Sequence, residues 1–393
     1  MKIALTCPAS LPATQFGGIL FLCLDIAKEL SSIGHDVTIY TTDLDFANNA
    51  KTFNKKLPRY EVLDKFKIKR SHVFFSLKLF YVNPEMFFQI RNDKPDIIHS
   101  IGIQSFQSII AAIISKQKKI PLVISDQGGL TTHPTFKSSI TKKILFKIHK
   151  PIIQFIINQA SKISVGNEYE KKIFLDYCDE NKIEIINNGI NLQSLKPSSI
   201  SFKKKFSIKD RYILFVGRFD KIKGIDILLQ AIHLIKDTKE MTNTKLVIMG
   251  VDFGFESTMF SMISKLQIND VVIVIKKPLR EDVIAAYQEC EFLVLPSRWE
   301  LSPLTPLEGF AFKKTVISTN AYGIPHTIEN GKTGVLVESE NYKILADAII
   351  ELLGNEAKRQ QLGLAGYVLV TEKCNSKIMA EKTLRTYQKI SNR

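Results

Sequence analysis

The chain alternates short apolar runs with longer segments in which apolar residues recur at helical spacing. In the first half, "KIALTCP" has the pattern of a buried strand, and "ILFLCLDIAKELSSIGH" follows it with the pattern of a helix that ends at Gly34. The same alternation continues through "DVTIYTT", "PDIIHSIG", "PLVISDQGG", "KISVGNE" and "KIEIINNGIN". Strands that alternate with helices predict a parallel sheet with helices on both of its faces.

A polar and basic stretch, "LQSLKPSSISFKKKF", interrupts this alternation of strand and helix patterns and predicts a linker near residues 192–207. The alternation restarts after it. Strands are predicted at "YILFVGR", "KLVIMG", "VVIVI", "FLVLPS", "TVIST" and "TGVLV", and helices at "GIDILLQAIHLI", "REDVIAAYQEC", from about Glu308, and from about Tyr342 to the end. We therefore expect an α/β protein of two doubly wound, Rossmann-like domains, over residues 1–195 and 196–371.

Composition supports two globular domains. The chain has 393 residues, of which 45% are hydrophobic and 24% charged, which argues against global disorder. Its cysteines are odd in number and contain no CxxC pair, which favours a reducing compartment and predicts no metal site: Cys7, Cys23, Cys178, Cys290 and Cys374. The N-terminal "MKIALTCPAS" lacks a long apolar run, so we expect no signal peptide, and no apolar tract reaches the length of a membrane span.

Positive charge is concentrated in the first half of the chain. The net charge is +15, and residues 51–94 hold eleven Lys and Arg against four Asp and Glu, a net of +7. Residues 116–150 hold eight Lys against one Asp, another +7. A basic face attracts phosphates, whether of anionic lipid, nucleic acid or a phosphorylated substrate. No nucleic-acid-binding motif accompanies it, so we expect no nucleic-acid partner.

The loops that follow strands are the places to look for chemistry, because ligands of doubly wound sheets bind beyond the carboxyl ends of the strands. In "FVGRFDKIKG", Gly217 lets the backbone approach a ligand, and Arg218 and Lys223 can clamp a diphosphate. The alternative is a turn with solvated charges. In "QFGGILF", Gly17 and Gly18 expose amides at a helix N-terminus, a favourable place for an anion, although glycines are also common in ordinary turns.

Two acids flank a proline-rich loop in "SRWELSPLTPLEGF". The amides of Leu304 and Thr305 can face a phosphate near the start of the following helix, so the carboxylates of Glu300 and Glu308 should meet neutral polar groups instead. Sugar hydroxyls suit a carboxylate, which accepts several hydrogen bonds. Glu308 could otherwise be a first-turn acid that favours the helix dipole, whereas Glu300 lies in a loop and has no such structural explanation.

Taken together, these segments resemble the family 4 glycosyltransferases, which are retaining, nucleotide-sugar-dependent enzymes of the GT-B fold. The resemblance covers nearly the whole chain in order. It rests on "ILFVGRFDKIKGIDILLQA", "LVIMG", "LPSRWELSPLTPLEGFA" and "GIPHTIENGKTGVLV" in the second half, and on "FGGILFLCLDIAKELSSIGHDVTIYTT", "PDIIHSIG" and "IINNGIN" in the first. It implies two domains that face each other across a cleft, with a last helix, about 372–393, that packs back on the first domain.

The resemblance also implies roles for the matching residues. Arg218 and Lys223 would hold the donor diphosphate and neutralise the leaving group. Glu308 would bond the nucleotide ribose, and Glu300 would contact hydroxyls of the transferred sugar. Gly17 and Gly18 would give the bound phosphate and the acceptor room. The family needs no metal, and this sequence has no DxD-type pair of acids in such a loop, so we expect no metal cofactor and no other cofactor besides the donor substrate.

Three departures from the family pattern stand out. Pro303 occupies a position where glycine is usual between the two glutamates, and Lys313 and Lys314 replace the glycine region of the family's A-x-G-x-P-V. In "SDQGG", Gln127 stands where the first domain often has a histidine. The catalytic base is therefore unassigned, and the candidates on the acceptor side are His99, Asp126, Gln127 and His133.

In this family the first domain selects the acceptor. Here "SHVFFSLKLFYVNPEMFFQIR" and the helical "KSSITKKILFKIHKPIIQFIINQA", residues 137–160, mix cations with aromatic and aliphatic residues. This mixture suggests a cytoplasmic enzyme that binds peripherally to an anionic membrane. Its acceptor would then be a lipid-linked or cell-surface glycan precursor. The apolar residues could equally form core beside ordinary surface lysines. Two other functions fit the same fold, namely a nucleotide-sugar epimerase and a non-catalytic nucleotide-sugar-binding homologue.

Overall fold

The computed structural model describes residues 1–45, 52–77, 80–128, 130 and 140–391. The chain divides into two compact units. Unit 1 comprises Met1–Asn188 together with Ser376–Arg393, and unit 2 comprises Gly189–Asn375. The changeover after residue 188 lies a few residues before the expected position after 195. The return to unit 1 at 376 lies a few residues beyond the expected 372.

Unit 1 is built on an eight-stranded sheet with the order β12-β11-β10-β9-β1-β2-β6-β5. Its strands are β1 (Lys2–Thr6), β2 (Asp36–Thr42), β5 (Tyr60–Leu63), β6 (Phe66–Ser71), β9 (Ile97–Ile101), β10 (Leu122–Ser125), β11 (Lys162–Val165) and β12 (Ile183–Ile185). All neighbours pair in parallel except β5, which pairs antiparallel with β6. The central strands are buried along nearly their whole length, as expected for a sheet covered on both faces.

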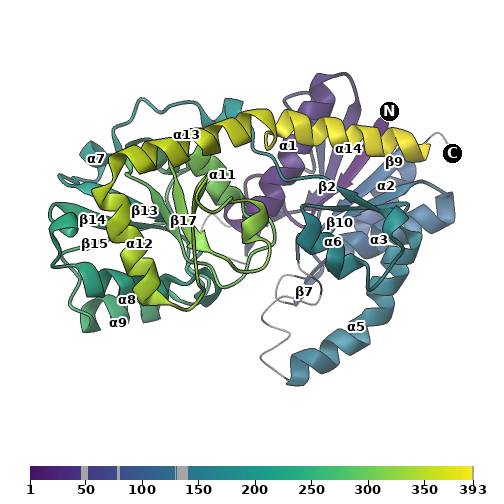
Figure 1. Cartoon of the computed structure of the whole chain (residues 1–393). Coiled ribbons are helices and arrows are strands. Elements are labelled where there is room, and N and C mark those ends of the chain that lie inside the picture. The colour runs from purple at the N-terminus through teal and green to yellow at the C-terminus, as the bar shows by residue number, and fades with distance from the viewer. Residues whose placement is uncertain (46–51, 78–79, 129, 131–139, 392–393) are drawn as a thin grey trace. The chain divides into compact units, whose positions relative to one another are not determined.

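The helices of unit 1 are α1 (Gly18–Ser32), α2 (Glu85–Asp93), α3 (Phe106–Lys118), α5 (Ile140–Gln159), α6 (Glu168–Phe174) and α14 (Ser376–Ser391). The final helix α14 packs on α1, and Ser376 Oγ donates a hydrogen bond to Glu29 at 2.6 Å (Figure 1). Two small antiparallel pairs complete the unit, β3 (Leu44–Asp45) with β4 (Thr52–Phe53) and β7 (Phe75–Leu77) with β8 (Phe80–Val82). The apolar pattern did not indicate β5 to β8, because charges and aromatics alternate too irregularly there.

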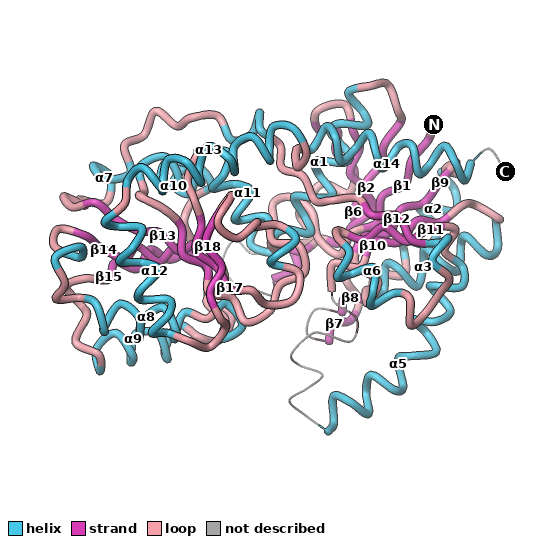
Figure 2. The backbone as a smooth tube through the Cα atoms, in the orientation of Figure 1, coloured by secondary structure: helices cyan, strands magenta, loops and turns pink. Residues whose placement is uncertain are grey.

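Unit 2 has a six-stranded, all-parallel sheet with the order β15-β14-β13-β16-β17-β18 (Figure 2). Its strands are β13 (Arg211–Val216), β14 (Thr244–Gly250), β15 (Val272–Lys276), β16 (Leu293–Leu295), β17 (Val316–Thr319) and β18 (Gly334–Val337). Its helices are α7 (Phe202–Lys205), α8 (Ile225–Ile235), α9 (Glu256–Lys265), α10 (Arg280–Glu289), α11 (Leu304–Ala311), α12 (Tyr342–Gly354) and α13 (Glu356–Glu372). The strands and helices agree with the predicted alternation.

The structure corrects two of the predicted elements. The segment 192–207 is not a free linker, because Leu195 and Phe202 are buried in the core of unit 2. The helix expected from about Glu308 begins four residues earlier, at Leu304. Pro306 does not prevent this, since the first turn of a helix has amides without intrahelical partners and tolerates a residue that lacks an N–H.

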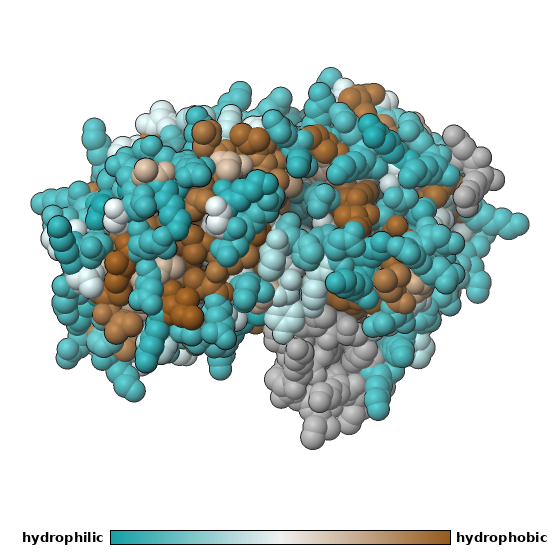
Figure 3. Space-filling model, in the orientation of Figure 1, coloured by the Kyte–Doolittle hydropathy of each residue, from teal (hydrophilic) through white to brown (hydrophobic). Residues whose placement is uncertain are grey.

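The two units have separate apolar cores. In unit 2, strands β13, β14 and β16 and helices α8 and α12 supply most of the buried side chains. In unit 1, α1 and α14 pack against β1 and β2, and a smaller cluster joins the loop after β1 to Val73 and Tyr81 of the β7–β8 region. Figure 3 shows hydrophilic side chains over most of the visible face, with apolar patches between them.

Candidate functional site

The loop after β13 forms a tight turn that positions Lys223. Asp220 caps the short 3-10 helix Lys221–Lys223 by accepting a 3.0 Å hydrogen bond from the amide of Ile222. Gly224 then adopts a φ of 70°, and a Cβ atom at this position would lie 2.0 Å from the carbonyl oxygen of Pro296. Position 224 therefore requires glycine for two reasons. Its backbone is left-handed, and the loop after β16 leaves no room for a side chain.

Lys223 and Glu300 meet across these two loops. The ammonium of Lys223 forms an ion pair with Oε1 of Glu300, and the hydroxyl of Ser297 donates to the same oxygen at 3.2 Å. Both charged side chains are largely buried, with 18% and 19% of their surfaces exposed. Two residues that are 77 positions apart in the sequence thus form one polar centre.

This centre lines a pocket at the carboxyl ends of β13, β16 and β17, which is the edge where doubly wound sheets bind ligands. About 300 Å³ of empty space, open solvent included, lies between the walls of the pocket. Its walls are Phe215, Val216, Lys223, Leu295, Ser297, Glu300, Pro303, Thr305, Pro306 and Ser318.

The N-terminus of α11 forms one wall of the pocket. Pro303 is the N-cap, and it has no side-chain acceptor for the first amides of the helix. Leu304 and Thr305 are the first two helical residues, and the third, Pro306, has no N–H. The helix therefore offers two amides and the positive end of its dipole beside Lys223, an arrangement that favours an anion.

Arg218 does not line this pocket. It follows β13, and its guanidinium lies over the ring of Phe253, 4.9 Å from the ring centroid. The residues predicted to bind one diphosphate are thus partly separated. Lys223 and the α11 amides lie together, whereas Arg218 rests on the loop after β14.

Glu308 lies in the second turn of α11 and faces α10. Its Oε1 accepts a 2.6 Å hydrogen bond from Arg280, and its Oε2 accepts a 2.8 Å hydrogen bond from the hydroxyl of Tyr287. Burial is the main cause that raises the pKa of Tyr287, and the nearby Glu308 carboxylate adds to it. Glu308 is therefore not a first-turn acid. Each carboxylate oxygen has a second lone pair, so the side chain can still accept from a ligand hydroxyl.

Arg298 is a positioning residue that sequence reasoning missed. Its guanidinium binds Asp226 of α8 through two hydrogen bonds of 2.6 and 2.8 Å, and it also pairs with Glu340. It donates to the carbonyl of Lys221 at 2.6 Å, and its backbone amide donates to the carbonyl of Ile222 at 2.7 Å. Arg298 thus joins the turn that carries Lys223 to the loop that carries Glu300. Its partners are too distant in sequence for any spacing to reveal them.

Gly17 and Gly18 stand at the N-terminus of α1 in unit 1. Gly17 is the N-cap with a φ of 103°, a conformation that favours glycine, and Gly18 is exposed as the first helical residue. A Cβ atom on Gly17 would meet nothing within 4 Å, so backbone conformation rather than crowding accounts for glycine here.

The four candidates on the acceptor side have different settings. Asp126 is buried and accepts hydrogen bonds from the amides of Gly128 and Leu130, at 3.2 and 3.3 Å, so it shapes the turn after β10. Gln127 has a φ of 54° in that turn and is half-buried. His133 lies outside the described residues. His99 is 1% exposed, and its two ring nitrogens bond to the hydroxyls of Tyr387 and Ser125.

His99 therefore ties α14 to the sheet, and we do not propose it as an acceptor ligand. Burial lowers its pKa to about 3. The folded protein keeps this ring neutral, whereas the unfolded chain protonates it below its usual pKa of about 6.5. The contribution of His99 to stability is complete above about pH 6.5 and is lost as the pH falls from there toward 3.

We expect this loss to amount to about 2 kcal/mol between pH 6.5 and pH 5, because each pH unit in the window is worth about 1.4 kcal/mol. The measurement is urea unfolding of the protein and of His99→Gln across this range. The difference in unfolding free energy between the two should shrink as the pH falls. Parallel pH profiles would show that His99 does not titrate on unfolding.

Two further properties concern metals and membranes. Across the described residues, His, Cys, Asp and Glu side chains gather nowhere in a group of three or more that could hold a metal ion. In the same part of the chain, no helix combines the length and the apolar character needed to cross a bilayer.

Comparison with known proteins identifies the family of both halves of the chain. Residues 198–368 match the family "Glycosyl transferases group 1", and residues 16–194 match "Glycosyltransferase Family 4". The capsular polysaccharide biosynthesis glycosyltransferase CapM of Staphylococcus aureus is 28% identical over 312 residues, covering 77% of this chain and 79% of CapM. The D-inositol 3-phosphate glycosyltransferase of Corynebacterium diphtheriae is 23% identical over 389 residues, covering 93% and 89%.

Solved structures show the same fold. Anabaena HepE, determined with UDP and glucose, has a TM-score of 0.78 at 16% identity and covers 99% of this chain and 100% of its own. WaaG, a glycosyltransferase involved in lipopolysaccharide biosynthesis, has a TM-score of 0.73 at 15% identity and covers 98% and 99%. These likenesses confirm the predicted GT-B fold.

Proposed function

The chain belongs to the family 4 glycosyltransferases, with a group 1 glycosyltransferase domain in its second half, and from this premise we propose that it is a retaining enzyme that moves a sugar from a nucleoside diphosphate sugar to a hydroxyl acceptor. The observation that carries the proposal is the polar centre of unit 2. One cation, one carboxylate and the first turn of helix α11 line a single pocket at the ligand edge of the sheet.

Each of these groups suits one part of the donor. The amides of Leu304 and Thr305 and the ammonium of Lys223 would hold the diphosphate, with Arg218 as a second cation from the neighbouring loop. Glu300 would accept hydrogen bonds from hydroxyls of the transferred sugar. Glu308, oriented by Arg280 and Tyr287, would accept from the ribose. The two acids would then lie near an anion without contacting it.

Transfer requires the bond between the anomeric carbon and the diphosphate oxygen to break while the acceptor oxygen bonds to that carbon. We propose that the acceptor approaches on the side of the leaving group, so that the departing phosphate oxygen takes its proton. This route gives retention and needs no protein base, which fits Gln127 in the place of a histidine. The cations would stabilise the charge that develops on the diphosphate without a metal ion.

The acceptor that we propose is a lipid-linked or cell-surface glycan precursor on the cytoplasmic side of a membrane. The likeness to CapM supports a role in polysaccharide biosynthesis. The basic first half of the chain supports contact with an anionic surface.

The direct test is a panel of UDP-, GDP- and ADP-sugars, with UDP-glucose first because HepE was also determined with it. We expect the correct nucleotide to raise the unfolding temperature, since a ligand at a hundred times its Kd stabilises a protein by about 2.7 kcal/mol. Slow hydrolysis of the matching donor should accompany this shift. An epimerase would instead yield a new sugar isomer without acceptor, and a non-catalytic homologue would bind without turnover. Failure of every nucleotide to stabilise the protein would contradict the proposal.

A further inference from the structure

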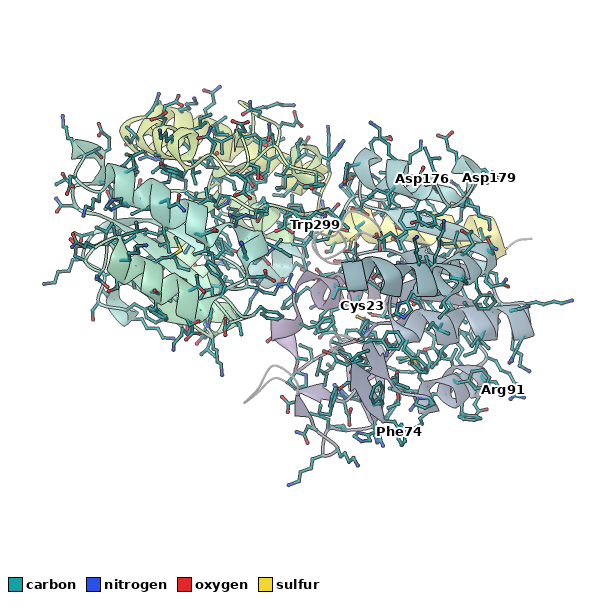
Figure 4. All side chains as sticks on the ribbon, turned by 90° about the horizontal axis from the view of Figure 1, so that it is seen from below. Cys23, Phe74, Arg91, Asp176, Asp179 and Trp299 are labelled. Atoms are coloured by element: carbon teal, nitrogen blue, oxygen red, sulfur yellow. The ribbon has the colours of Figure 1, made fainter. Side chains whose placement is uncertain are left out.

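The β7–β8 hairpin exposes more apolar surface than any structural role within unit 1 explains. Phe74 is 84% exposed, Phe75 55% and Leu77 58%. Figure 4 shows Phe74 at the outer margin of unit 1. Single exposed apolar residues are common on soluble proteins, but three within four positions form a patch of the kind that marks an interaction site.

The base of the hairpin packs against the rest of unit 1, so the exposed residues are held in a defined position on the surface. Val73 and Tyr81 are buried in the cluster formed with the loop after β1. Phe80 packs edge-to-face on Phe106 of α3, with ring centroids 6.0 Å apart. The two strands pair in a defined register, with Phe75 opposite Val82. Buried Val73 before β7 and the packed residues of β8 thus hold an apolar projection in place.

Three cations lie in the segment that follows β4, whose Phe53 packs edge-on against Tyr81 of β8 with ring centroids 5.4 Å apart. Lys55, Lys56 and Arg59 are exposed. The amide of Arg70, near the end of β6, donates to the carbonyl of Arg59 at 2.9 Å, and the guanidinium of Arg59 lies 3.5 Å from Glu85 at the start of α2. Arg59 therefore lies between the strand from which the hairpin departs and the helix to which it returns.

The helix α5 carries further positive charge. It packs on α3, which in turn contacts β8. Lys147 and Lys150 of α5 are exposed, and Figure 1 shows β7 and α5 below the sheet of unit 1. An apolar projection with cations around it matches the interface of an anionic bilayer, where apolar side chains enter between headgroups and cations meet the phosphates.

We propose that the β7–β8 hairpin is an interfacial anchor that inserts Phe74, Phe75 and Leu77 into the surface of an anionic membrane, with Lys55, Lys56 and Arg59 against the lipid phosphates. The proposal rests on the proposed function in one respect, because a lipid-linked acceptor would be met at such a surface. It assigns the membrane contact to a defined hairpin rather than to the basic character of the whole first half.

The experiment is co-sedimentation of the full chain with vesicles of phosphatidylcholine alone and of phosphatidylcholine mixed with phosphatidylglycerol, at low and at physiological salt. We expect binding to the mixed vesicles that weakens with salt, and little binding to the neutral ones. The variant Phe74→Ser/Phe75→Ser should lower the partition coefficient at least about tenfold, because two aromatic side chains no longer leave water.

The matched control is Leu234→Ser/Leu364→Ser, which removes two exposed apolar side chains, 53% exposed each, from unit 2. It should bind vesicles within about twofold of the unaltered chain if the hairpin is the anchor. Thermal unfolding of both variants checks that they fold. Equal losses in both variants, or no loss in the hairpin variant, would overturn the proposal, as would the absence of binding to mixed vesicles at either salt concentration.

A tryptophan at position 74 reports insertion directly. The chain has a single tryptophan, Trp299, which is buried in unit 2 and gives a constant background. The emission of Phe74→Trp should shift to shorter wavelength on addition of mixed vesicles and not of neutral ones. A concentration-dependent shift without lipid would identify a second copy of the chain as the occupant and overturn the proposal. Nucleotide binding is measured separately, so failure of the donor proposal leaves this result readable.

Discussion

Replacing Lys223 by alanine is expected to lower the rate of sugar transfer by about a hundred- to a thousandfold while the protein stays folded. The ammonium of Lys223 is a cation that the structure places in the pocket that the first turn of α11 lines. Charge develops on the diphosphate as the glycosidic bond breaks, and a fixed cation there stabilises the transition state more than the ground state. Its removal also leaves the Glu300 carboxylate without its cationic partner, with the Ser297 hydroxyl still bonded to it.

The neighbouring lysine supplies a matched control. Lys221 lies in the same turn, but its side chain is exposed and the site uses only its backbone carbonyl. We expect Lys221→Ala to retain turnover within about twofold, as is usual for a surface substitution. Donor hydrolysis and transfer are measured for both variants, with thermal unfolding as the check on folding.

The double variant Lys223→Ala/Glu300→Gln separates two causes of the loss. If part of it comes from repulsion between Glu300 and the diphosphate, nucleotide binding should recover partly in the double variant, since the two residues are in contact and their effects are not additive. Wild-type turnover in Lys223→Ala would rule out the diphosphate role.

The sequence predicted the parts of this protein that depend on local pattern. Buried strands and amphipathic helices follow from periodicity, and the placement of Lys223 and Glu300 after strands was enough to bring them to one edge of the sheet. The start of α11 was missed because prolines usually end helices, while in the first turn they are tolerated. The hydrogen-bond partners of Glu308 could not be predicted from the sequence, because Arg280 and Tyr287 reach it through tertiary packing of α10 against α11.

The structure also accounts for two departures from the family pattern. Pro303 has a φ of −66°, the value that proline prefers, so this position needs no glycine to form the loop. Lys313 has a φ of 57°, a left-handed conformation in which glycine is the usual residue, and a lysine there costs about 1 kcal/mol. The first substitution suits its backbone, whereas the second is tolerated at some cost in stability.

Arg298→Leu is expected to destabilise unit 2 by about 3 kcal/mol, because it leaves the carboxylate of Asp226 largely buried without its partner. For a unit of this size, the unfolding temperature should fall by about 6 to 12 °C. Burial lowers the pKa of Arg298, but its hydrogen bonds to Asp226 and Glu340 outweigh this and leave the pKa raised, so the guanidinium is charged at every pH of interest.

Transfer should fall in the same variant even at temperatures where it is fully folded, since the guanidinium of Arg298 joins the loop of Glu300 to the turn of Lys223 through the carbonyl of Lys221, and of its two bonds to this turn only the backbone bond to Ile222 remains. Arg298→Lys keeps the charge but not the planar fork that binds Asp226 through two hydrogen bonds, so it should recover part of the stability. Arg298→Leu/Asp226→Leu removes both charges and should be more stable than Arg298→Leu alone, yet still slow in transfer, because the side-chain bond to the Lys221 carbonyl is absent. If the double variant regained full activity, the arginine would serve only to neutralise Asp226, and the ion pair of Lys223 with Glu300 would not depend on it.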